Sequence, residues 1–359
     1  MAPIATPLAV STSPRSGLRT RAVAGVVRSA AFARAMALLD SLDRTRAPVL
    51  PVLMYHRIGF EERTPELDPS LLSATPAEFA RQVKHLASER RVLSLDDLLE
   101  VRRGRMALPP RSVVVTFDDG YRDFQEHAWP ALRRHGVPAT LFVPTAYPGD
   151  PQRTFWWDRL HAAFATTARR APLSTAAGTL ALRSADERRL AARTLRDWVK
   201  RTTHDEAMAE VDHVTAALSG RLPLRCVLTW AELRELARDG LDLAPHTRTH
   251  PMIDQVTLEQ AEQEILGSVS DLEREVGHRS RAFAFPAGAL TDAVVRWLPQ
   301  AGIELAFTTR RGANHLERVD WLRIRRINVG RRSPWPVVQA QLLPWPTIAA
   351  RRIRRPGRF

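Results

Sequence analysis

The chain has 359 residues, enough for one large domain or two small ones, and its hydrophobic content of 44% is normal for a globular core. Its single cysteine, Cys226, excludes an intramolecular disulfide, and no apolar run is long enough to span a bilayer. A net charge of +14 favours anionic partners, but no nucleic-acid reader motif accompanies it, so no nucleic-acid partner is expected.

Residues 1–47 form an N-terminal extension whose Pro-, Ser- and Thr-rich start we expect to be disordered. Within it Ala22–Leu39 is apolar, but Arg28 and Arg34 interrupt both a signal-peptide core and a membrane span. We interpret this segment as an amphipathic helix that packs on the domain or lies on a membrane surface. Residues 346–359 form a basic tail that could also meet a membrane surface. The expected location is bacterial, either cytoplasmic or membrane-peripheral.

The region 48–345 alternates strand and helix signals. Strands are expected at Val49–His56, Val113–Phe117, Ala139–Val143, Leu241–Ala244, Ala282–Phe285, Leu305–Thr309 and Ile324–Val329. Capping boxes at Thr75–Glu78 and Thr229–Glu232 begin two of the intervening helices, and a long amphipathic helix covers Thr257–Val276. This alternation predicts a parallel sheet or barrel.

Polar residues that could carry chemistry follow three of these strands. Thr116–Gly120 contains two adjacent acids, of which one could bind a cation while the other moves protons; the alternative is an ordinary polar turn. His246 and His250 could share one face of a helix or converge in a tight loop, and two histidines with a carboxylate make a recurrent hydrolytic metal site. Phe283–Gly288 closes a third strand with a Pro- and Gly-containing turn. Barrel enzymes place their active sites at such strand ends.

In this order the three clusters resemble the motifs of the polysaccharide deacetylase family, the NodB-homology type of carbohydrate esterase. The family's Thr-Phe-Asp-Asp-Gly motif is matched residue for residue, its His-Ser/Thr-x-x-His motif is matched at His246–His250, and its aromatic-Pro-Tyr-Gly turn is partly matched at Phe285–Gly288. The resemblance covers roughly residues 50–335 and implies a distorted, incomplete (β/α) barrel of about seven strands with a helical insertion.

The resemblance also implies roles for individual residues. Asp119, His246 and His250 would hold one divalent metal, with zinc the expected ion, and Asp118 would be the general base. The remaining candidates are His56 and His315 as proton donors, Pro286 and Ala287 around the oxyanion, and Tyr55 and Trp156 as substrate contacts.

The chain departs from the family pattern in three places. Ala284 stands where many members have an Arg that orients the catalytic acid, with Arg281 as a nearby candidate replacement. Ala287 replaces the usual aromatic residue after Pro286. The final Leu-x-x-His motif, which supplies the protonating histidine in many members, is not found.

Residues 150–225 interrupt the strand–helix rhythm and predict a helical insertion that overhangs the active-site face. The aromatic residues Phe155, Trp156 and Trp157 either stack on sugar rings or anchor the insertion to the barrel, and anchoring is favoured.

The resulting expectation is a monomeric hydrolase of the cell envelope that removes N-acetyl groups from an N-acetylated polysaccharide or lipid-linked glycan. Two alternatives stay open: the same barrel cleaving a formyl group or another amide, and a catalytically weak relative that only binds glycan.

Overall fold

The computed structural model describes residues 30–42, 48–218, 223, 225–331 and 333–343. The Pro-, Ser- and Thr-rich start and the basic tail at 346–359, for which we predicted disorder and membrane contact, lie outside the described residues. No helix among the residues described is both long and apolar enough to cross a membrane.

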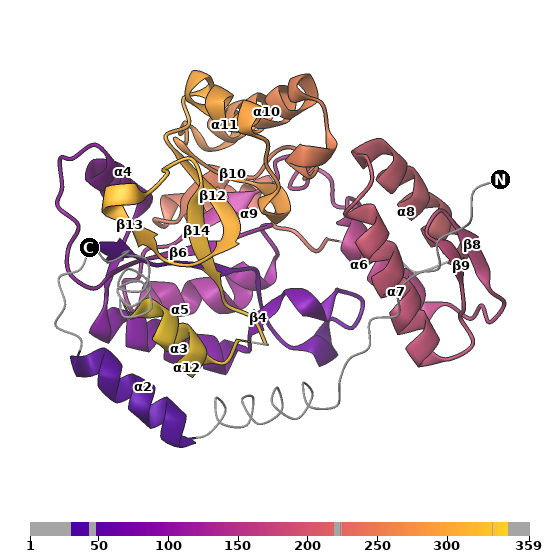
Figure 1. Ribbon diagram of the computed structural model, residues 1–359, viewed down its shortest axis with the longest axis horizontal. Coiled ribbons are helices and arrows are strands. Elements are labelled where there is room, and N and C mark those ends of the chain that lie inside the picture. Colours follow the sequence, from indigo (N-terminus) through magenta and orange to yellow (C-terminus); the bar gives the residue numbers. More distant parts are fainter. Residues whose placement is uncertain (1–29, 43–47, 219–222, 224, 332, 344–359) are drawn as a thin grey trace, which may run out of the picture.

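A curved parallel sheet forms the centre of the molecule (Figure 1). Seven strands follow one another in the order β10-β7-β6-β2-β14-β12-β11, and β5 pairs with β6 beside this path. Their bounds are β2 (Val52–Tyr55), β5 (Arg91–Leu93), β6 (Ser112–Phe117), β7 (Thr140–Val143), β10 (Asp242–Pro245), β11 (Ala282–Ala284), β12 (Leu305–Arg311) and β14 (Ile324–Asn328).

The barrel stays open between its two terminal strands, β10 and β11, which form no strand pair. The side chain of His246 bridges this gap at the carboxyl end, where its Nδ1 lies 2.7 Å from the carbonyl oxygen of Ala284. The structure therefore confirms the predicted incomplete (β/α) barrel of seven strands, and the candidate histidine itself lies at the opening.

Helices cover the outside of the sheet. They are α2 (Ala30–Leu42), α3 (Pro76–Glu89), α4 (Leu95–Arg102), a π-helix at Phe124–Ala128 that continues into α5 (Trp129–Arg134), α9 (Trp230–Arg238), α10 (Leu258–Val276), α11 (Asp292–Trp297) and α12 (Trp335–Leu342). The capping boxes expected at Thr75 and Thr229 are present, and a third at Thr257 begins α10. Helix α2 lies beside α12 (Figure 1) and covers Ala30–Leu39 of the predicted N-terminal helix, whose first residues, 22–29, lie outside the described part of the chain.

Shorter elements connect the barrel strands. They are β1 (Val49–Leu50), β3 (Arg57–Ile58), β4 (Leu72–Ala74), β13 (Asn314–His315) and 3-10 turns at Glu61–Arg63, Pro69–Leu71, Ile253–Gln255, Pro286–Gly288, Leu298–Ala301 and Leu316–Arg318.

The predicted insertion forms a lobe at one side of the barrel (Figure 1). It contains α6 (Trp156–Thr166), α7 (Ala185–Val199) and α8 (His204–Leu218), together with a two-stranded hairpin, β8 (Leu173–Thr175) and β9 (Gly178–Leu180), that the sequence did not predict. The lobe has an apolar core of its own, to which Met252 from the barrel side contributes.

Side chains alternate between the two faces of the barrel strands, as strand geometry requires. The interior holds Val52, Val114, Phe142, Phe307 and Ile324. The outward positions pack under the helices and include Leu53, Val115, Leu141 and Ile327. Residue parity along each strand therefore decides which side chains can reach the interior of the barrel.

Candidate active site

Strand parity places Asp118 and His56 at the carboxyl end of the barrel interior. The interior row of β6 runs from Val114 through Thr116 and continues to Asp118, directly after the strand. The interior row of β2 runs from Val52 and continues to His56, directly after that strand. Asp118 is 2% exposed, and both Asp118 and His56 line one cavity of about 280 Å³. The two strands are neighbours, so residues 62 positions apart in the chain meet at one site.

Tyr55 does not reach this cavity, which corrects our prediction that it contacts substrate. Tyr55 is the last residue of β2 and directly precedes His56, so its side chain points to the opposite face of the sheet. Its ring is fully buried against Phe79 and Phe117, and its hydroxyl donates a 2.9 Å hydrogen bond to Oε1 of Gln82 on α3. Tyr55 belongs to the packing between barrel and helix.

Asp118 is held by a buried arginine that the sequence analysis did not identify. Arg326, on β14, donates to both carboxylate oxygens of Asp118 at 2.7 Å. The same guanidinium donates to Oγ1 of Thr116 at 3.2 Å and to the carbonyl oxygen of Thr308 at 2.9 Å. Such a bidentate pair fixes the plane of the carboxylate as well as its position.

Arg281, our candidate for the orienting arginine, does not perform this role. Its side chain is 56% exposed and pairs with Glu304 at 3.0 Å at the amino-terminal end of β12. Arg326 lies at an interior position of its strand, two residues after Ile324, whereas Arg281 precedes β11. The orienting arginine is therefore supplied by a different strand from the one that carries it in many family members.

Asp119, His246 and His250 come together as predicted. Nε2 of His246 and Nε2 of His250 lie 3.6 Å and 3.4 Å from the same oxygen of Asp119, Oδ1. All three residues are buried, and one ligand atom of each lies within 4.8 Å of the other two. Two imidazole nitrogens and a carboxylate oxygen converging from one side match the donor set of a catalytic zinc site with an open position.

Unusual backbone conformations bring these ligands to one point. Asp119, Thr247 and His250 have φ angles of 75°, 64° and 64°, in the left-handed region that non-glycine residues rarely adopt. His246–His250 is thus a tight loop rather than a helix, the second of the two arrangements left open by its spacing. Strain of this kind is maintained only where surrounding contacts enforce it.

Helix α10 supplies those contacts for the histidine loop. Glu264 accepts hydrogen bonds from the backbone N–H groups of Arg248 and Thr249, each at 2.8 Å, and from the Thr249 hydroxyl at 2.7 Å. Oγ1 of Thr247 accepts from the His250 N–H at 3.0 Å. Glu264 is a supporting residue that local sequence reasoning missed, because it lies in the long helix rather than in the motif.

The protonation states of the cluster residues suit the binding of a cation next to an ionised carboxylate. Burial lowers the pKa of His246 to about 4, so its imidazole is neutral near pH 7, the form that binds metals. Burial alone would raise the pKa of Asp118, but the Arg326 guanidinium outweighs it and holds that pKa at about 2. Burial likewise opposes ionisation of Asp119, and hydrogen bonding with His250 overcomes it, so the pKa of Asp119 is lowered. Both carboxylates are therefore ionised at neutral pH.

The third motif forms a tight turn that reaches the same cavity. Ala287 lines the cavity with φ of 53°, and its carbonyl oxygen accepts a 2.9 Å hydrogen bond from the Thr309 hydroxyl. Pro286 is buried directly before it and begins the turn. A backbone position with this conformation beside the cluster can present an N–H group to the cavity, with no need for an aromatic side chain.

The insertion closes one side of the cavity. Trp156 and Trp157 from α6 and Arg196 and Lys200 at the end of α7 line it, which confirms that the insertion overhangs this face. Phe155 is fully buried in stacking contact with Trp157, and the Trp157 ring lies 5.0 Å from that of His250. Phe155 thus anchors the insertion, whereas Trp156 and Trp157 are both partly exposed and both line the cavity.

His315 lies far from this site, which corrects our prediction of a catalytic role. His315 lies on β13 and pairs with Val49 of β1. Because β1 precedes β2 in the chain, this pair lies at the amino-terminal end of the barrel, opposite the cavity. His56 is the one of the two candidate proton donors that lines the cavity.

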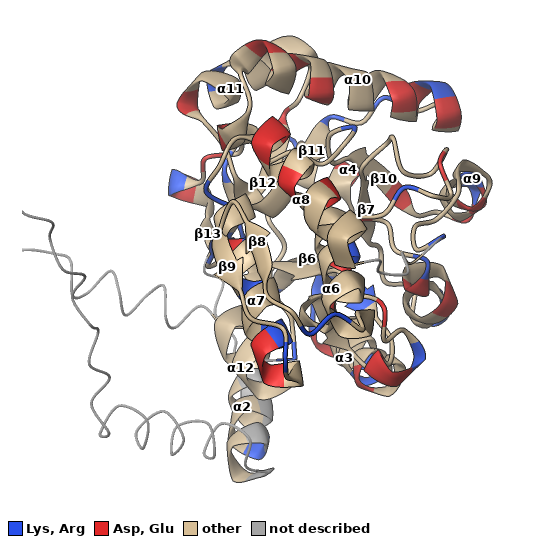
Figure 2. Ribbon diagram, turned by 90° about the vertical axis from the view of Figure 1, so that its right-hand side faces the viewer, with Lys and Arg blue, Asp and Glu red and all other residues tan. Residues whose placement is uncertain are grey.

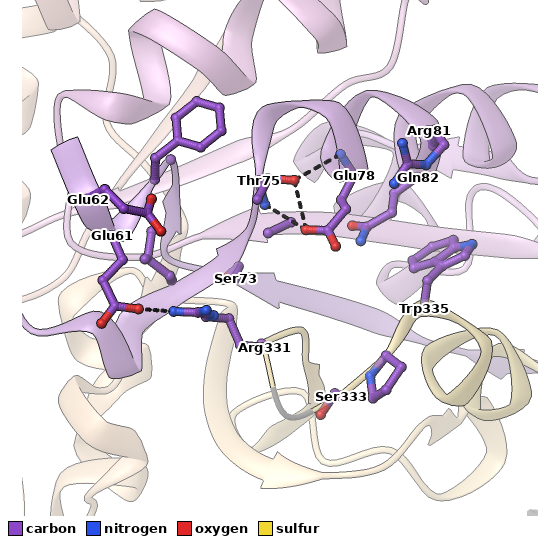
Figure 3. A pocket seen from close by; sticks show the side chains of 16 residues that line it. Glu61, Glu62, Ser73, Thr75, Glu78, Arg81, Gln82, Arg331, Ser333 and Trp335 are labelled. Carbon is purple, nitrogen blue, oxygen red and sulfur yellow. Dashed lines mark hydrogen bonds and ion pairs between the residues drawn. The ribbon is translucent and has the colours of Figure 1, made fainter. Parts of the chain in front are cut away.

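A second hollow is lined by β4, the start of α3 and the start of α12 (Figure 3). It is larger, about 400 Å³ against about 280 Å³, but its walls carry the Arg331–Glu61 ion pair and the Thr75–Glu78 capping contacts. The residues described contain one group of three potential metal ligands, Asp119 with its two histidines, and it is not in this hollow. The smaller cavity is therefore the candidate active site, because it is the one that holds these potential metal ligands.

The fold is an incomplete (β/α) barrel. Its carboxyl end carries an Asp–His–His cluster and a second carboxylate held by an arginine, a combination that defines a class of hydrolytic barrel proteins. The chain belongs to the polysaccharide deacetylase family, whose model matches residues 105–306. That span contains Asp118, Asp119 and both histidines of the cluster, but it excludes His56 and Arg326, which only the fold brings to the site.

Curated relatives agree with this assignment. A poly-beta-1,6-N-acetyl-D-glucosamine N-deacetylase of Staphylococcus aureus (strain MSSA476) is 33% identical over 79 residues, which is 22% of this chain and 27% of that protein. A putative polysaccharide deacetylase of Bacillus subtilis (strain 168) is 29% identical over 28% of this chain and 34% of its own length. The aligned part is thus about a quarter to a third of these relatives.

Two solved structures share the fold across most of the chain. The Streptococcus pyogenes deacetylase PplD in complex with acetate superposes with a TM-score of 0.56 at 18% identity, covering 82% of this chain and 99% of that one. IcaB from Ammonifex degensii gives a TM-score of 0.52 at 21% identity, covering 82% and 97%.

Proposed function

We propose that this protein is a metal-dependent hydrolase that removes N-acetyl groups from an N-acetylated polysaccharide or lipid-linked glycan. The observation that carries the proposal is one cavity that combines the buried Asp119, His246 and His250 ligand set with the Asp118 carboxylate held by Arg326. The name of the Staphylococcus aureus relative supports an N-acetylated sugar polymer as the substrate class.

The ligand set fits a divalent cation, with zinc the ion we expect, because neutral imidazole and carboxylate donors converge in a buried site. Bound there, the cation would lower the pKa of a water molecule and polarise an amide carbonyl.

Asp118 is the proposed general base. Arg326 keeps it ionised and holds both of its oxygens in one plane, so its orientation toward the cavity is fixed before substrate arrives. A carboxylate with a pKa of about 2 is a weak base, and it can accept a proton only from water that is already acidified. This weakness is itself a reason for the proposal to include a cation.

His56 is the proposed proton donor to the departing amine. It lines the same cavity from β2, and its backbone N–H is fixed by Oγ of Ser73 at 3.0 Å. The turn at Pro286 and Ala287 would present a backbone N–H to the developing oxyanion, and Trp156 would contact the sugar.

The decisive experiment measures metal content and acetate release together on a panel of N-acetylated glycans. We expect about one divalent metal per chain, acetate release that stops on chelation, and loss of release in Asp118→Asn with the metal retained. Metal-loaded protein that releases no acetate from any of these glycans would refute the proposal. Formate in place of acetate would indicate a different amide hydrolase, and glycan binding that survives Asp118→Asn with background turnover would indicate a binding protein.

A monomeric state and contact with a membrane surface remain predictions. Light scattering of the purified chain and flotation with anionic vesicles test them directly.

A further inference from the structure

The charged groups of the cavity are almost all paired. Asp118 faces Arg326, and Asp119 faces the two histidines of the cluster. Asp68 is buried and accepts a 2.7 Å hydrogen bond from Arg196 of the insertion. After these pairs, the cationic side chain left on the cavity wall is Lys200.

Lys200 follows the last residue of α7, where the insertion meets the cavity. Among the residues described, no carboxylate lies within the 4.0 Å ion-pair distance of its ammonium group. Partial burial and the Arg196 guanidinium lower the pKa of Lys200, while the carboxylates of Asp197 and Asp68 act in the opposite direction. The exposed ammonium group thus has one guanidinium and two carboxylates around it, neither of the carboxylates in ion-pair contact.

The choice of lysine is unusual for this chain. Lys84 and Lys200 are the only lysines among 53 basic residues. A lysine ammonium is a compact point charge on a flexible stem, which suits an anion whose position varies, whereas an arginine fork suits a fixed planar partner.

We propose that Lys200 binds an anionic substituent, a carboxylate or phosphate, on the glycan that occupies the cavity, so that the preferred substrate is an acidic N-acetylated glycan. This inference rests on the proposed function and narrows its substrate class. A bound anion would pair with the ammonium group on the cavity wall that has no carboxylate within ion-pair distance among the residues described. The contact is partly exposed to water, so its effect is moderate and falls as salt rises.

The kinetic test uses three oligosaccharides of equal length: N-acetylglucosamine oligomer, the same oligomer phosphorylated at O6, and alternating N-acetylglucosamine and glucuronic acid. For wild type we expect kcat/KM to be higher for an acidic oligomer than for the neutral one. In Lys200→Met the acidic-to-neutral ratio should fall about fivefold, mainly through KM, and in Lys200→Glu it should fall further. The phosphate and carboxylate arms show which anion is preferred.

Lys84→Met is the matched control, because Lys84 is the other lysine and is exposed on α3. It should keep the wild-type ratio. A ratio that is unchanged in Lys200→Met, or a wild type that prefers the neutral oligomer, would overturn the inference.

A measurement without substitution gives a second readout. Acetic anhydride modifies both lysines of the wild-type chain, and mass spectrometry distinguishes them. At equal fractional saturation, an acidic oligomer should slow modification of Lys200 relative to Lys84 more than the neutral oligomer does. Equal protection by both oligomers would contradict an ion pair.

The two proposals fail in different ways. Absence of acetate release from every oligomer refutes the deacetylase function, whereas calorimetric binding to chelator-treated protein still reports whether Lys200 selects acidic glycans. Deacetylation that ignores substrate charge refutes only the role of Lys200.

Discussion

At the scale of single residues, the site depends on how one carboxylate is held. Asp118 is buried with Arg326, and neither charge could be removed alone without leaving the other uncompensated in the barrel interior. The pairing lowers the basicity of Asp118 but fixes its direction. Arg326 thus fixes the orientation of Asp118 at the expense of its proton affinity. Such a weak base can accept a proton from the attacking water only if another group, such as a bound cation, lowers the pKa of that water.

The conservative change Arg326→Lys tests this orientation. Lysine keeps the positive charge, so the barrel should fold, but it cannot donate to both oxygens of Asp118 in parallel. We expect kcat for acetate release to fall at least about tenfold, in line with losses from a misplaced general base, while bound metal stays near one per chain. Metal analysis and kinetics on the same preparation check this.

Arg281→Met is the control, since Arg281 is exposed and pairs only with Glu304. It should retain wild-type turnover. If Arg281→Met loses as much activity as Arg326→Lys, the loss in Arg326→Lys cannot be assigned to the missing bidentate hydrogen bonds to Asp118.

Residue identities were predictable where a motif is local, and less so where partners are distant in sequence. The cluster of Asp119 with two histidines and the neighbouring Asp118 were found from short patterns. Arg326 lies 208 positions from Asp118 and meets it only through the register of β14 and β6 around β2. An arginine two residues after Ile324 in a predicted strand was the available signal, because parity makes it an interior residue.

At the scale of elements, the third-motif turn is shaped by a close approach of two backbones. Gly288 has φ of 72°, and a Cβ there would lie 2.1 Å from Oγ1 and 2.6 Å from the backbone nitrogen of Thr309. Glycine is required at this position both for its conformation and for its size.

Gly288→Ala should therefore lower the free energy of unfolding by about 2–4 kcal/mol, combining left-handed strain with a backbone clash. Urea unfolding measures this. Gly136→Ala is the matched control: its φ is 60°, with no atom within 4 Å of the added Cβ, so it should show only the smaller conformational cost. Equal losses in both variants would mean that contact with Thr309 is unimportant.

A buried hydrogen-bond chain joins the insertion to the loop that carries Asp118 and Asp119. Asp158 of α6 accepts from the Tyr121 hydroxyl at 2.6 Å and from the backbone N–H of Asp68 at 2.7 Å, and Tyr121 accepts from Nε1 of Trp157 at 2.8 Å. Burial raises the pKa of Asp158 to about 7, although its hydrogen bonds and the Arg57 guanidinium act to lower it.

This shift predicts how Asp158 affects stability with pH. The unfolded chain releases this proton near its ordinary pKa of 3.8, whereas the folded chain retains it until about pH 7. Its contribution to the free energy of unfolding is therefore fully present below pH 4 and is lost as pH rises to about 7, by at most about 1.4 kcal/mol per pH unit.

Asp158→Asn removes this titration, so its stability relative to wild type should rise between pH 4 and 7. Urea unfolding of both chelator-treated proteins across that range tests it, because other titrating groups cancel in the difference. Asp186→Asn, at a carboxyl that is 88% exposed, should stay parallel to wild type. A constant difference for Asp158→Asn would contradict the raised pKa.

Elements were predicted well where local chemistry specifies them. Capping boxes at Thr75 and Thr229 and the strand ends that carry the motifs all appear as expected. The β8–β9 hairpin was missed because its strands are three residues each, too short for a period-two pattern to be recognised.

At the scale of the whole molecule, the barrel depends on contacts at its carboxyl end. The charged residues of the outer helix α10 are mostly acidic, with Arg274 as its one basic residue (Figure 2). The opening between β10 and β11 is bridged by His246, and the cluster joins the loop after β6 to the loop after β10. The alternation of strands and helices in the sequence predicted a parallel sheet or barrel. It could not predict where the barrel stays open, because that depends on which strands pair, and these strands are far apart in the chain.

A cation at this cluster would therefore link separate parts of the barrel and stabilise the folded chain by mass action. Zinc at 100 times its dissociation constant should add about 2.7 kcal/mol, which for a chain of this length raises Tm by about 4 °C. The measurement is thermal unfolding of chelator-treated protein with and without zinc. His246→Ala should lose this increase, whereas His315→Ala, changed at the amino-terminal end of the barrel, should keep it whatever its own Tm. An equal increase in both variants would place the bound zinc elsewhere, and no increase in wild type would show that the folded cluster does not bind it.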